Sequence, residues 1–182
     1  MPVCVQPVDL GPRLGDDDRA VLRHILALKP GGHAAEFGVW RGTTLAMIAA
    51  VMPVTGFDSF AGLPEDWRPG FPKGTFAGNV PVLPPGADLV VGEFADTVPG
   101  WEPPSPLGLV HIDSDLYSSA VTVLAGIRRH LRPGGYLVFD EFHGYPGAAA
   151  HEQRAWREFV TRTRIRYTVI GHGREQWACR LT

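Results

Sequence analysis

The chain alternates short apolar runs with segments in which apolar residues recur every three or four positions. Short apolar runs bounded by glycine, proline or polar residues predict buried strands. We expect such strands over 34–39, 54–57, 89–91, 107–112 and 136–139. Leu45, Ile48, Ala49 and Met52 have helical spacing and predict an amphipathic helix between the first two strands. Two further helices are expected to have side-chain caps, the first from 16–18 and the second from Ser118 or Ser119, and another helix is expected over 149–162.

Two C-terminal apolar segments, 167–170 and 177–181, are joined through a Gly-His-Gly turn and are expected to pair as antiparallel strands. The preceding strand–helix repeats instead predict parallel strands, because each helix returns the chain to the same end of the sheet. The predicted fold class is therefore α/β, with a doubly wound, mainly parallel sheet and helices on both faces. Ligands of such sheets bind at the carboxyl ends of the strands. That edge should collect Glu36, Asp58, Gly92, Asp113 and Asp140.

Composition and charge favour a single globular domain and disfavour a nucleic-acid-binding protein. With 182 residues, 45% of them hydrophobic and 20% charged, the chain has the size and composition of one globular domain. We expect a single domain over 1–182, with an N-terminal helix region over 1–32 and a long loop over 61–87. The formal net charge of −2 provides no basic surface for nucleic acid.

Cysteine usage and the N-terminus bear on localisation. Cys4 and Cys179 have the spacing of neither a disulfide framework nor a C-x-x-C metal site, and they fit a reducing compartment. The N-terminus lacks the basic start and apolar core of a signal peptide, and no apolar run is long enough to span a bilayer. We therefore expect a cytoplasmic protein that binds neither membranes nor nucleic acid.

The first predicted strand ends in a glycine turn that leads into a helix, with the pattern Glu36-x-Gly38-x-x-x-Gly42-Thr43-Thr44. The glycines allow the backbone to approach a ligand closely, and the free N–H groups at the helix start favour a carboxylate or a phosphate. Asp58, at the tip of the next strand, can accept two hydrogen bonds from a ribose diol. This pattern predicts a site for a cofactor that contains a nucleoside.

The charge beside the turn distinguishes two cofactors. A dinucleotide site has the pattern G-x-G-x-x-G, whereas this turn lacks the third glycine and Glu36 would repel a pyrophosphate. Glu36 would instead attract the ammonium of a methionine moiety, whose carboxylate would reach the helix start and Thr43 or Thr44. The pattern therefore favours S-adenosylmethionine. A turn without a ligand, in which Glu36 is a partly exposed strand end, stays open at this point.

Acidic residues follow the fourth and fifth predicted strands, in the sequences His-Ile-Asp-Ser-Asp and Phe-Asp-Glu. Adjacent parallel strands would bring Asp113, Asp140 and Glu141 together. Three carboxylates repel one another unless a cation neutralises them, and hard divalent ions such as Mg²⁺ prefer oxygen ligands. A substrate hydroxyl bound to such an ion has a lowered pKa and is a better nucleophile. Alternatively, these side chains cap the following turns and contact the cofactor.

These motifs resemble those of class I S-adenosylmethionine-dependent methyltransferases, in particular the macrocin-type group, which O-methylates sugars of macrolides and related natural products. The resemblance runs from Gly31 to the C-terminus. It rests on the segments EFGVWRGTT, FDSFAGLPEDW, KGTF, GEFADTVP, HIDSDLYSSA, LRPGGYLVFDEFHGYPG and GREQWACRL. It implies a seven-stranded sheet with an antiparallel terminal strand. The catechol O-methyltransferases are more distantly similar.

The resemblance also implies roles for single residues. The pattern of the catechol enzymes assigns the methionine end of the cofactor to Glu36, Gly38 and Thr44, and the ribose to Asp58. It assigns a divalent metal, Mg²⁺, to Asp113, Asp140 and Glu141. The whole set that we assign to binding S-adenosylmethionine is Glu36, Gly38, Trp40, Gly42, Thr43, Thr44, Asp58, Ser59, Gly92, Phe94 and Asp113. Of these, Trp40 either belongs to the core or flanks the adenine.

Two departures from the resemblance concern the base and the substrate cover. The catechol enzymes carry a lysine base shortly after the first metal aspartate, where this chain has Leu116. Asp115 and His143 are the nearest replacements, and histidine has a suitable unperturbed pKa. Macrolide-sugar enzymes also carry an N-terminal extension over the substrate, whereas the first predicted strand here begins at residue 34. We expect the loop 61–87 to act as a lid with its aromatic residues, and a second subunit to complete the cover in a homodimer.

Together these features predict an S-adenosylmethionine-dependent O-methyltransferase. We expect the acceptor to be a hydroxyl of a small molecule, such as a sugar of a natural product, with assistance from Mg²⁺. The reaction would be an in-line displacement at the sulfonium methyl, for which the protein supplies alignment and activation of the hydroxyl. Two other classes stay open: a cofactor-binding domain of this fold that transfers no methyl group, and, less favoured, a nicotinamide-dependent oxidoreductase.

Overall fold

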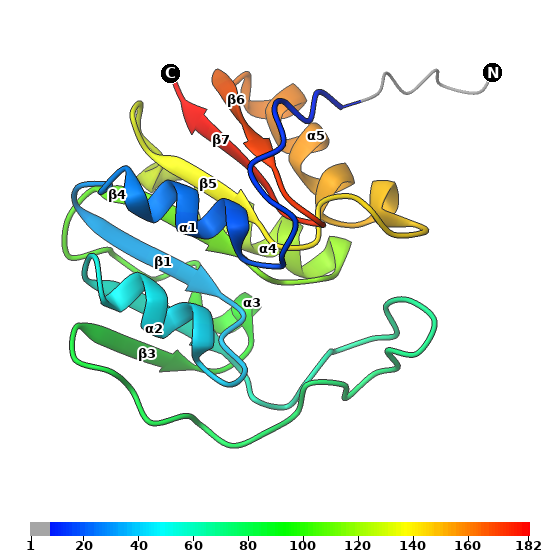
Figure 1. The fold of residues 1–182 in the computed structure, drawn as a ribbon. Coiled ribbons are helices and arrows are strands. Elements are labelled where there is room, and N and C mark those ends of the chain that lie inside the picture. Colours follow the sequence, from blue (N-terminus) through cyan, green and yellow to red (C-terminus); the bar gives the residue numbers. More distant parts are fainter. Residues whose placement is uncertain (1–7) are drawn as a thin grey trace.

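The computed structural model describes residues 8–182, and its central feature is a seven-stranded sheet (Figure 1). The strands lie in the order β3-β2-β1-β4-β5-β7-β6. Their bounds are β1 His33–Phe37, β2 Val54–Asp58, β3 Ala87–Val91, β4 Leu107–Ile112, β5 Tyr136–Phe139, β6 Tyr167–His172 and β7 Trp177–Leu181. The predicted fold class is confirmed, because the sheet is mainly parallel and ends in antiparallel strands.

The direction of each strand follows from its connection. The first five strands are joined through helices or long loops, and they pair in parallel. β7 returns from β6 through a short turn and lies antiparallel to both β5 and β6. The strand order reverses between β1 and β4. The carboxyl ends of these two strands are therefore the position at which doubly wound sheets bind their ligands.

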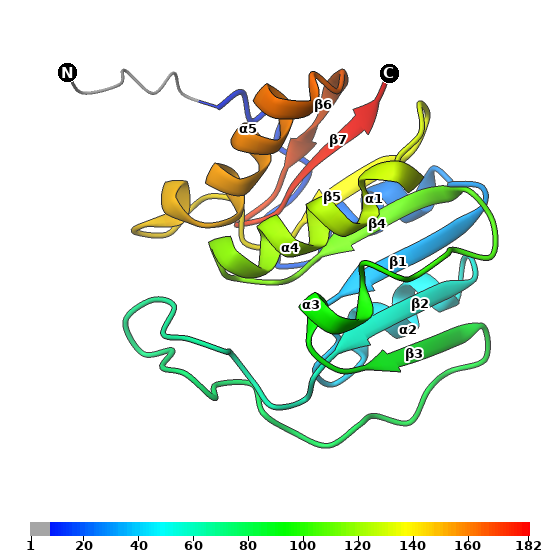
Figure 2. The same ribbon diagram turned by 180° about the vertical axis from the view of Figure 1, so that it is seen from behind.

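Helices cover both faces of the sheet. Their bounds are α1 Ala20–Ala27, α2 Thr43–Ala49, α3 Phe94–Thr97, α4 Tyr117–Ile127 and α5 Glu152–Thr163, with single 3₁₀ turns at Arg128–His130 and Ala148–Ala150. α1 and α2 cover the face toward the viewer in Figure 1, and α3, α4 and α5 cover the face seen in Figure 2. The predicted stripe at Leu45 and Ile48 packs in the first layer, whereas Trp156 and Phe159 pack in the second. Burying one such side chain contributes about 1.5–3 kcal/mol.

Two helices begin differently from the prediction. α4 starts at Tyr117 without a side-chain cap from Ser118 or Ser119. α1 has no side-chain cap from its preceding residue, Arg19. Instead, Gln176 from the distant β6–β7 turn accepts hydrogen bonds from Val21 N (3.2 Å) and Leu22 N (3.3 Å). The free N–H groups of α1 are thus satisfied through the tertiary structure, which local sequence patterns do not reveal.

The long loop lies at the carboxyl edge of the parallel strands. It contains neither helix nor strand between β2 and β3, and it extends past the sheet edge at the lower right of Figure 1. Within residues 8–182, no helix is long and apolar enough to cross a membrane. Cys179 in β7 is a buried free thiol, and Cys4 lies outside the described residues.

Candidate functional site

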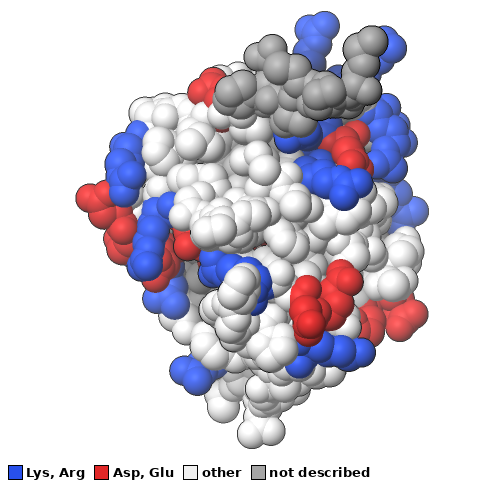
Figure 3. All heavy atoms as spheres, turned by 90° about the vertical axis from the view of Figure 1, so that its right-hand side faces the viewer, with Lys and Arg blue, Asp and Glu red and all other residues white. Residues whose placement is uncertain are grey.

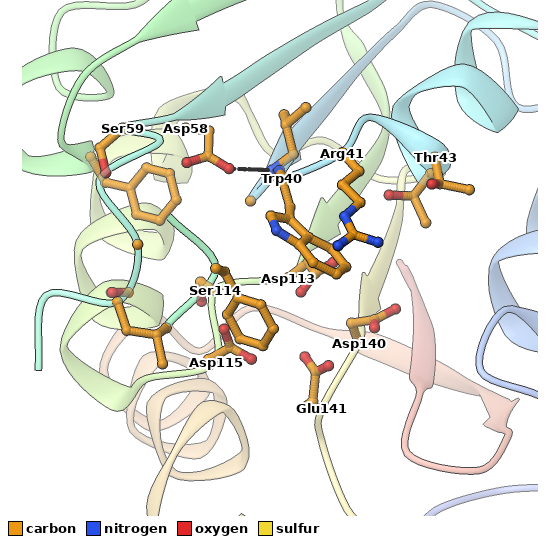
Figure 4. Close-up of a pocket in the computed structure, with 18 of the residues that line it drawn as sticks. Trp40, Arg41, Thr43, Asp58, Ser59, Asp113, Ser114, Asp115, Asp140 and Glu141 are labelled. Atoms are coloured by element: carbon orange, nitrogen blue, oxygen red, sulfur yellow. Dashed lines mark hydrogen bonds between the residues drawn. The ribbon is translucent and has the colours of Figure 1, made fainter. Parts of the chain in front are cut away.

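A pocket with a cavity volume of about 390 Å³ opens at the carboxyl ends of the parallel strands. This volume lies within the range of small-molecule sites. Most of the residues assigned from the sequence line it: Gly38, Trp40, Thr43, Thr44, Asp58, Ser59, Gly92, Phe94, Asp113, Asp115, Asp140 and Glu141. Figure 4 shows the labelled carboxylates of the β4 and β5 ends pointing into the same space below Trp40. Glu36, Gly42 and His143 lie outside this lining.

Gly38 brings the end of β1 against the end of β4. Its φ is +97°, and a Cβ atom at this position would lie 1.8 Å from the carbonyl oxygen of Asp113. The Asp113 N–H donates to the carbonyl of Phe37 at 2.8 Å, which fixes the two strand ends side by side. A side chain at position 38 would force them apart. This glycine therefore sets the distance between the glycine turn and the acidic residues after β4.

Asp58 holds the glycine turn in shape. Its Oδ2 accepts hydrogen bonds from Val39 N and Trp40 N, both at 2.8 Å, and its Oδ1 accepts one from Phe60 N at 2.7 Å (Figure 4). Trp40 has a φ of +44°, a conformation that few non-glycine residues adopt. The hydrogen bonds from Val39 N and Trp40 N to the Asp58 carboxylate stabilise the turn in this conformation. The sequence pattern predicts a ligand contact for Asp58 and does not reveal this structural task.

A buried chain of polar side chains runs behind the pocket. His111 Nδ1 lies 2.8 Å from Glu36 Oε1, and His111 Nε2 lies 3.2 Å from Asp140 Oδ1. Burial disfavours the imidazolium, yet the hydrogen bonds to Asp140 and Glu36 raise the pKa of His111 well above its ordinary value. Burial also opposes the ionised form of Asp140, but the hydrogen bond from His111 holds the pKa of that carboxyl below its ordinary value. These contacts favour the imidazolium form of His111, whereas burial raises the pKa of the Glu36 carboxyl.

The hydrogen bond to His111 shows that the Glu36 side chain is not where the sequence predicted it. The side chain is fully buried and binds His111 instead of facing the pocket. The reason is the register of the sheet, in which Glu36 of β1 pairs directly with His111 of β4. Two polar residues inside neighbouring apolar strands each require a partner, and each is the other's partner. One oxygen of Glu36 is thus taken by His111, while Oε2 is buried without a hydrogen-bond partner among residues 8–182.

Three other carboxylates, none of them hydrogen-bonded to His111, form a cluster. Ligand oxygens of Asp113, Asp115 and Glu141 all lie within 4.8 Å of one another. Burial, followed by the charge of Asp140, raises the pKa of Asp113 and Glu141 well above their ordinary values. The same causes raise the pKa of Asp115 to about 7. The ionised forms are destabilised because burial and mutual repulsion act in the same direction.

The cluster has the donor chemistry that a hard divalent cation requires. Its oxygens are the ligand type that Mg²⁺ prefers, and Glu141 Oε2 is buried without a hydrogen-bond partner. The set differs in one member from the predicted Asp113, Asp140 and Glu141, because Asp115 joins it and Asp140 does not. Asp140 Oδ1 is occupied by His111 and by the side-chain amide of Gln176. The residues present therefore fit a cation, and Asp113 and Glu141 belong to both sets.

His143 is placed away from the reacting region. Its Nε2 lies 3.2 Å from the carbonyl oxygen of Gln176, and its ring faces His172 at a centroid distance of 5.1 Å. The loop after β5 turns this side chain toward the β6–β7 hairpin. His143 thus lies outside the pocket lining, and its assignment as a catalytic base stays a prediction. Asp115 lines the pocket and is the other candidate from the sequence.

The loop 61–87 covers one side of the pocket through an aromatic cluster. Leu63 and Trp67 are buried against Leu116, which follows β4. The guanidinium of Arg68 lies 4.0 Å from the centroid of the Trp67 ring and 4.3 Å from that of Tyr145. Arg68 also forms an ion pair with Glu175 at 3.1 Å. The predicted aromatic residues thus dock the loop onto the ends of β4, β5 and the β6–β7 turn, and its lid role stays a prediction.

Several residues around the pocket were not assigned from the sequence. His111, Glu152 and Gln176 are buried polar residues that hold the acidic strand ends. For His111 a signal existed, since a polar residue within an apolar strand requires a partner on a neighbouring strand. Glu152 and Gln176 lie 38 and 36 positions from Ser114 and Asp140, respectively, and no local pattern links them. On the molecular face viewed in Figure 3, basic and acidic side chains are intermixed and form no continuous basic surface.

Known proteins share this fold and parts of this sequence. The family described as a methyltransferase domain matches residues 35–142. A curated relative from Streptomyces olivaceus, named 8-demethyl-8-(2,3-dimethoxy-alpha-L-rhamnosyl)-tetracenomycin-C 4'-O-methyltransferase, is 29% identical over 148 residues. The alignment covers 65% of this chain and 56% of that relative, so the chain spans little more than half of its length.

Solved structures extend the similarity over most of the chain. The calicheamicin methyltransferase CalS11 matches with a TM-score of 0.68 and 24% identity, covering 90% of this chain and 76% of that chain. The O-methyltransferase NovP matches with a TM-score of 0.68 and 21% identity, covering 91% of this chain and 78% of that chain. At this level of identity the two structures establish a common fold.

Proposed function

This chain belongs to the methyltransferase-domain family, and we propose that it transfers a methyl group from S-adenosylmethionine to a hydroxyl of a small molecule. The observation that carries the proposal is the pocket itself. It combines a glycine turn suited to a nucleoside-containing cofactor with a cluster of carboxylates whose oxygens are close enough to hold a cation. A nicotinamide site would require further glycines at the turn, and it would leave the acidic cluster without a task.

The cofactor would lie across the ends of β1, β2 and β3. We assign its methionine end to the turn from Gly38 to Thr44 and its adenosine to Asp58, Ser59, Gly92 and Phe94, all of which border the pocket. Asp58 has two tasks in this proposal. Its oxygens already accept three backbone N–H groups, so a ribose hydroxyl would use the remaining acceptor capacity of Oδ1.

The acceptor oxygen would attack the sulfonium methyl from the side opposite the sulfur. A bond forms between this oxygen and the methyl carbon while the carbon–sulfur bond breaks, and its electron pair stays on the sulfur of S-adenosylhomocysteine. We assign the acceptor's proton to Asp115, a carboxylate that lines the pocket beside Asp113 and Glu141. A divalent cation, when bound, would lower the pKa of the acceptor hydroxyl. Asp113, Glu141 and the free Oδ2 of Asp140 would hold it.

The acceptor class is proposed from the relatives and from the cover of the pocket. The Streptomyces olivaceus relative is named for methylation of a rhamnosyl group, and we propose a sugar hydroxyl of a natural product here as well. The loop 61–87 would shield the reacting atoms from water, with Arg68 and Phe76 bordering the pocket. A second copy of the chain would complete the cover in a homodimer.

Calorimetry tests the proposal directly. S-adenosylmethionine, S-adenosylhomocysteine and NAD are titrated into the protein, each with and without Mg²⁺. We expect both sulfur-containing ligands to bind and NAD not to bind. Binding of NAD alone would support an oxidoreductase and refute the proposal. Binding of S-adenosylhomocysteine without methyl transfer to any sugar-containing acceptor would instead support a cofactor-binding domain.

A further inference from the structure

Glu152, the first residue of α5, connects the two acidic strand ends. Its side chain is fully buried. Oε1 accepts hydrogen bonds from the backbone N–H of Ser114 at 3.1 Å and from the Ser114 hydroxyl at 3.2 Å. Oε2 accepts one from the backbone N–H of Glu141 at 3.3 Å. One carboxyl group thus spans the turn after β4 and the turn after β5.

The backbone groups that Glu152 holds belong to the residues that carry the acidic cluster. Ser114 lies between Asp113 and Asp115, and Glu141 is itself a member of the cluster. Fixing these two N–H groups fixes the direction in which the flanking carboxylates leave the backbone. Within residues 8–182, no hydrogen bond joins the side chains of 113–115 to those of 140–141, so Glu152 provides a direct link between the two turns.

Packing alone does not account for a glutamate at this position. A fully buried carboxyl group costs free energy through desolvation unless it is hydrogen-bonded. Replacing a buried charged group by an apolar side chain of similar size is often neutral or stabilising in proteins. In this structure the two oxygens of the carboxyl group accept from both turns, one oxygen from each.

We propose that Glu152 is a positioning residue that holds the β4 and β5 turns in the arrangement required to bind a divalent cation. The inference rests on the proposed function, because it presupposes a cation among Asp113, Asp140 and Glu141. Glu152 contacts neither the pocket nor a substrate; it acts through the backbone of Ser114 and Glu141.

The Glu152→Gln variant tests this role with little change in shape. A glutamine has one acceptor oxygen and one NH₂ group, and the NH₂ group cannot accept from a backbone N–H. One of the two turns is therefore released. We expect the dissociation constant for Mn²⁺, measured by electron paramagnetic resonance on the protein saturated with S-adenosylhomocysteine, to rise roughly 10- to 100-fold, the usual effect of losing an outer-sphere partner.

The matched control is Glu158→Gln on the same helix. Glu158 is on the outer side of α5, where it binds Tyr117 Oη at 2.7 Å and Arg154 Nε at 2.8 Å. This variant should bind Mn²⁺ and S-adenosylhomocysteine as the parent does. The Glu152→Gln variant should also retain the parent's affinity for S-adenosylhomocysteine, because the cofactor half of the pocket does not depend on α5.

The outcomes separate this inference from the proposed function. Equal Mn²⁺ affinity in Glu152→Gln and the parent overturns the inference alone. A parallel loss of S-adenosylhomocysteine affinity also overturns it, since Glu152 would then support the whole fold. A parent that binds S-adenosylhomocysteine but no Mn²⁺ overturns both the inference and the metal assignment. If Glu152→Gln does not fold, Ser114→Ala removes only the hydroxyl contact, and it must weaken Mn²⁺ binding several-fold for the inference to stand.

Discussion

The two halves of the pocket handle negative charge in opposite ways. In the half formed by β1 and β2, the Asp58 carboxylate accepts three backbone N–H groups at 2.7–2.8 Å. In the half formed by β4 and β5, Asp113, Asp115 and Glu141 crowd together, and Glu141 Oε2 has no hydrogen-bond partner. The first carboxylate is satisfied by the fold, whereas burial and mutual repulsion destabilise the ionised forms of the second group.

This difference indicates that the β1–β2 half of the pocket is preformed, whereas the β4–β5 half is completed by a ligand. A buried polar group without a partner costs free energy, so a fold retains it only where something else supplies the partner. His111 is hydrogen-bonded to Asp140 and Glu36 but to none of the other three carboxyl groups. We therefore expect the cofactor half to tolerate removal of metal and the acidic half to depend on it.

Removal of divalent cations should have the largest effect on the rate of methyl transfer. If it had no effect, the acidic half would not depend on metal, and the contrast between the two halves would be wrong. EDTA should lower the rate of methyl transfer by roughly 1,000-fold or more, because a cation that activates a hydroxyl contributes several kcal/mol. Adding Mg²⁺ in excess should restore the rate. Affinity for S-adenosylhomocysteine, measured by calorimetry, should not change. Full activity in chelator would rule out the metal and leave Asp115 as the sole activator.

The Asp115→Asn variant separates the base from the metal ligands. Removing a general base lowers kcat by about 100-fold or more, and we expect Mn²⁺ to bind this variant as it binds the parent. Asp140→Asn is the matched comparison, because it should weaken metal binding and leave S-adenosylhomocysteine affinity intact. If Asp115→Asn instead abolishes Mn²⁺ binding, the ligand set is Asp113, Asp115 and Glu141, and Asp115 is a metal ligand.

The Asp58→Asn variant tests the cofactor half. It keeps the shape of the side chain but turns one acceptor oxygen into a donor that faces backbone N–H groups. Loss of a charge-assisted hydrogen bond to ribose costs about 1.5–3 kcal/mol, so affinity for S-adenosylhomocysteine should fall roughly 10- to 100-fold. The free energy of unfolding should fall as well, since the glycine turn loses support. An unchanged dissociation constant would show that Asp58 only braces the turn.

Much of this arrangement was predictable because it follows from local patterns. Short apolar runs and strand–helix repeats predict the parallel sheet, and the sheet alone brings Asp58, Asp113 and Asp140 to one edge. Gly38 was identifiable for the same reason, since a turn that approaches another backbone requires glycine. Predictions made at strand ends therefore agree well with the positions in the structure.

The remaining details depend on side-chain partners that are distant in sequence. Glu36 turns inward because strand register pairs it with His111, and Asp140 is partly occupied because Gln176 returns from the last hairpin. The helix starts at Ala20 and Tyr117 also lack the predicted side-chain caps. Each of these positions has more than one polar partner within reach, and only the packed structure decides among them.

The His143→Gln variant should have the smallest effect on activity and binding. It tests whether the acidic half of the pocket extends as far as His143. The ring lies 3.2 Å from the carbonyl oxygen of Gln176, burial lowers its pKa, and it does not border the pocket. A glutamine amide can donate to the same carbonyl, so the β6–β7 turn should keep its shape. We expect kcat, and the dissociation constants for Mn²⁺ and S-adenosylhomocysteine, to match those of the parent. A fall of kcat as large as that of Asp115→Asn, with cofactor and metal binding unchanged, would return His143 to the reacting centre, because only a group that handles the acceptor's proton would affect kcat alone.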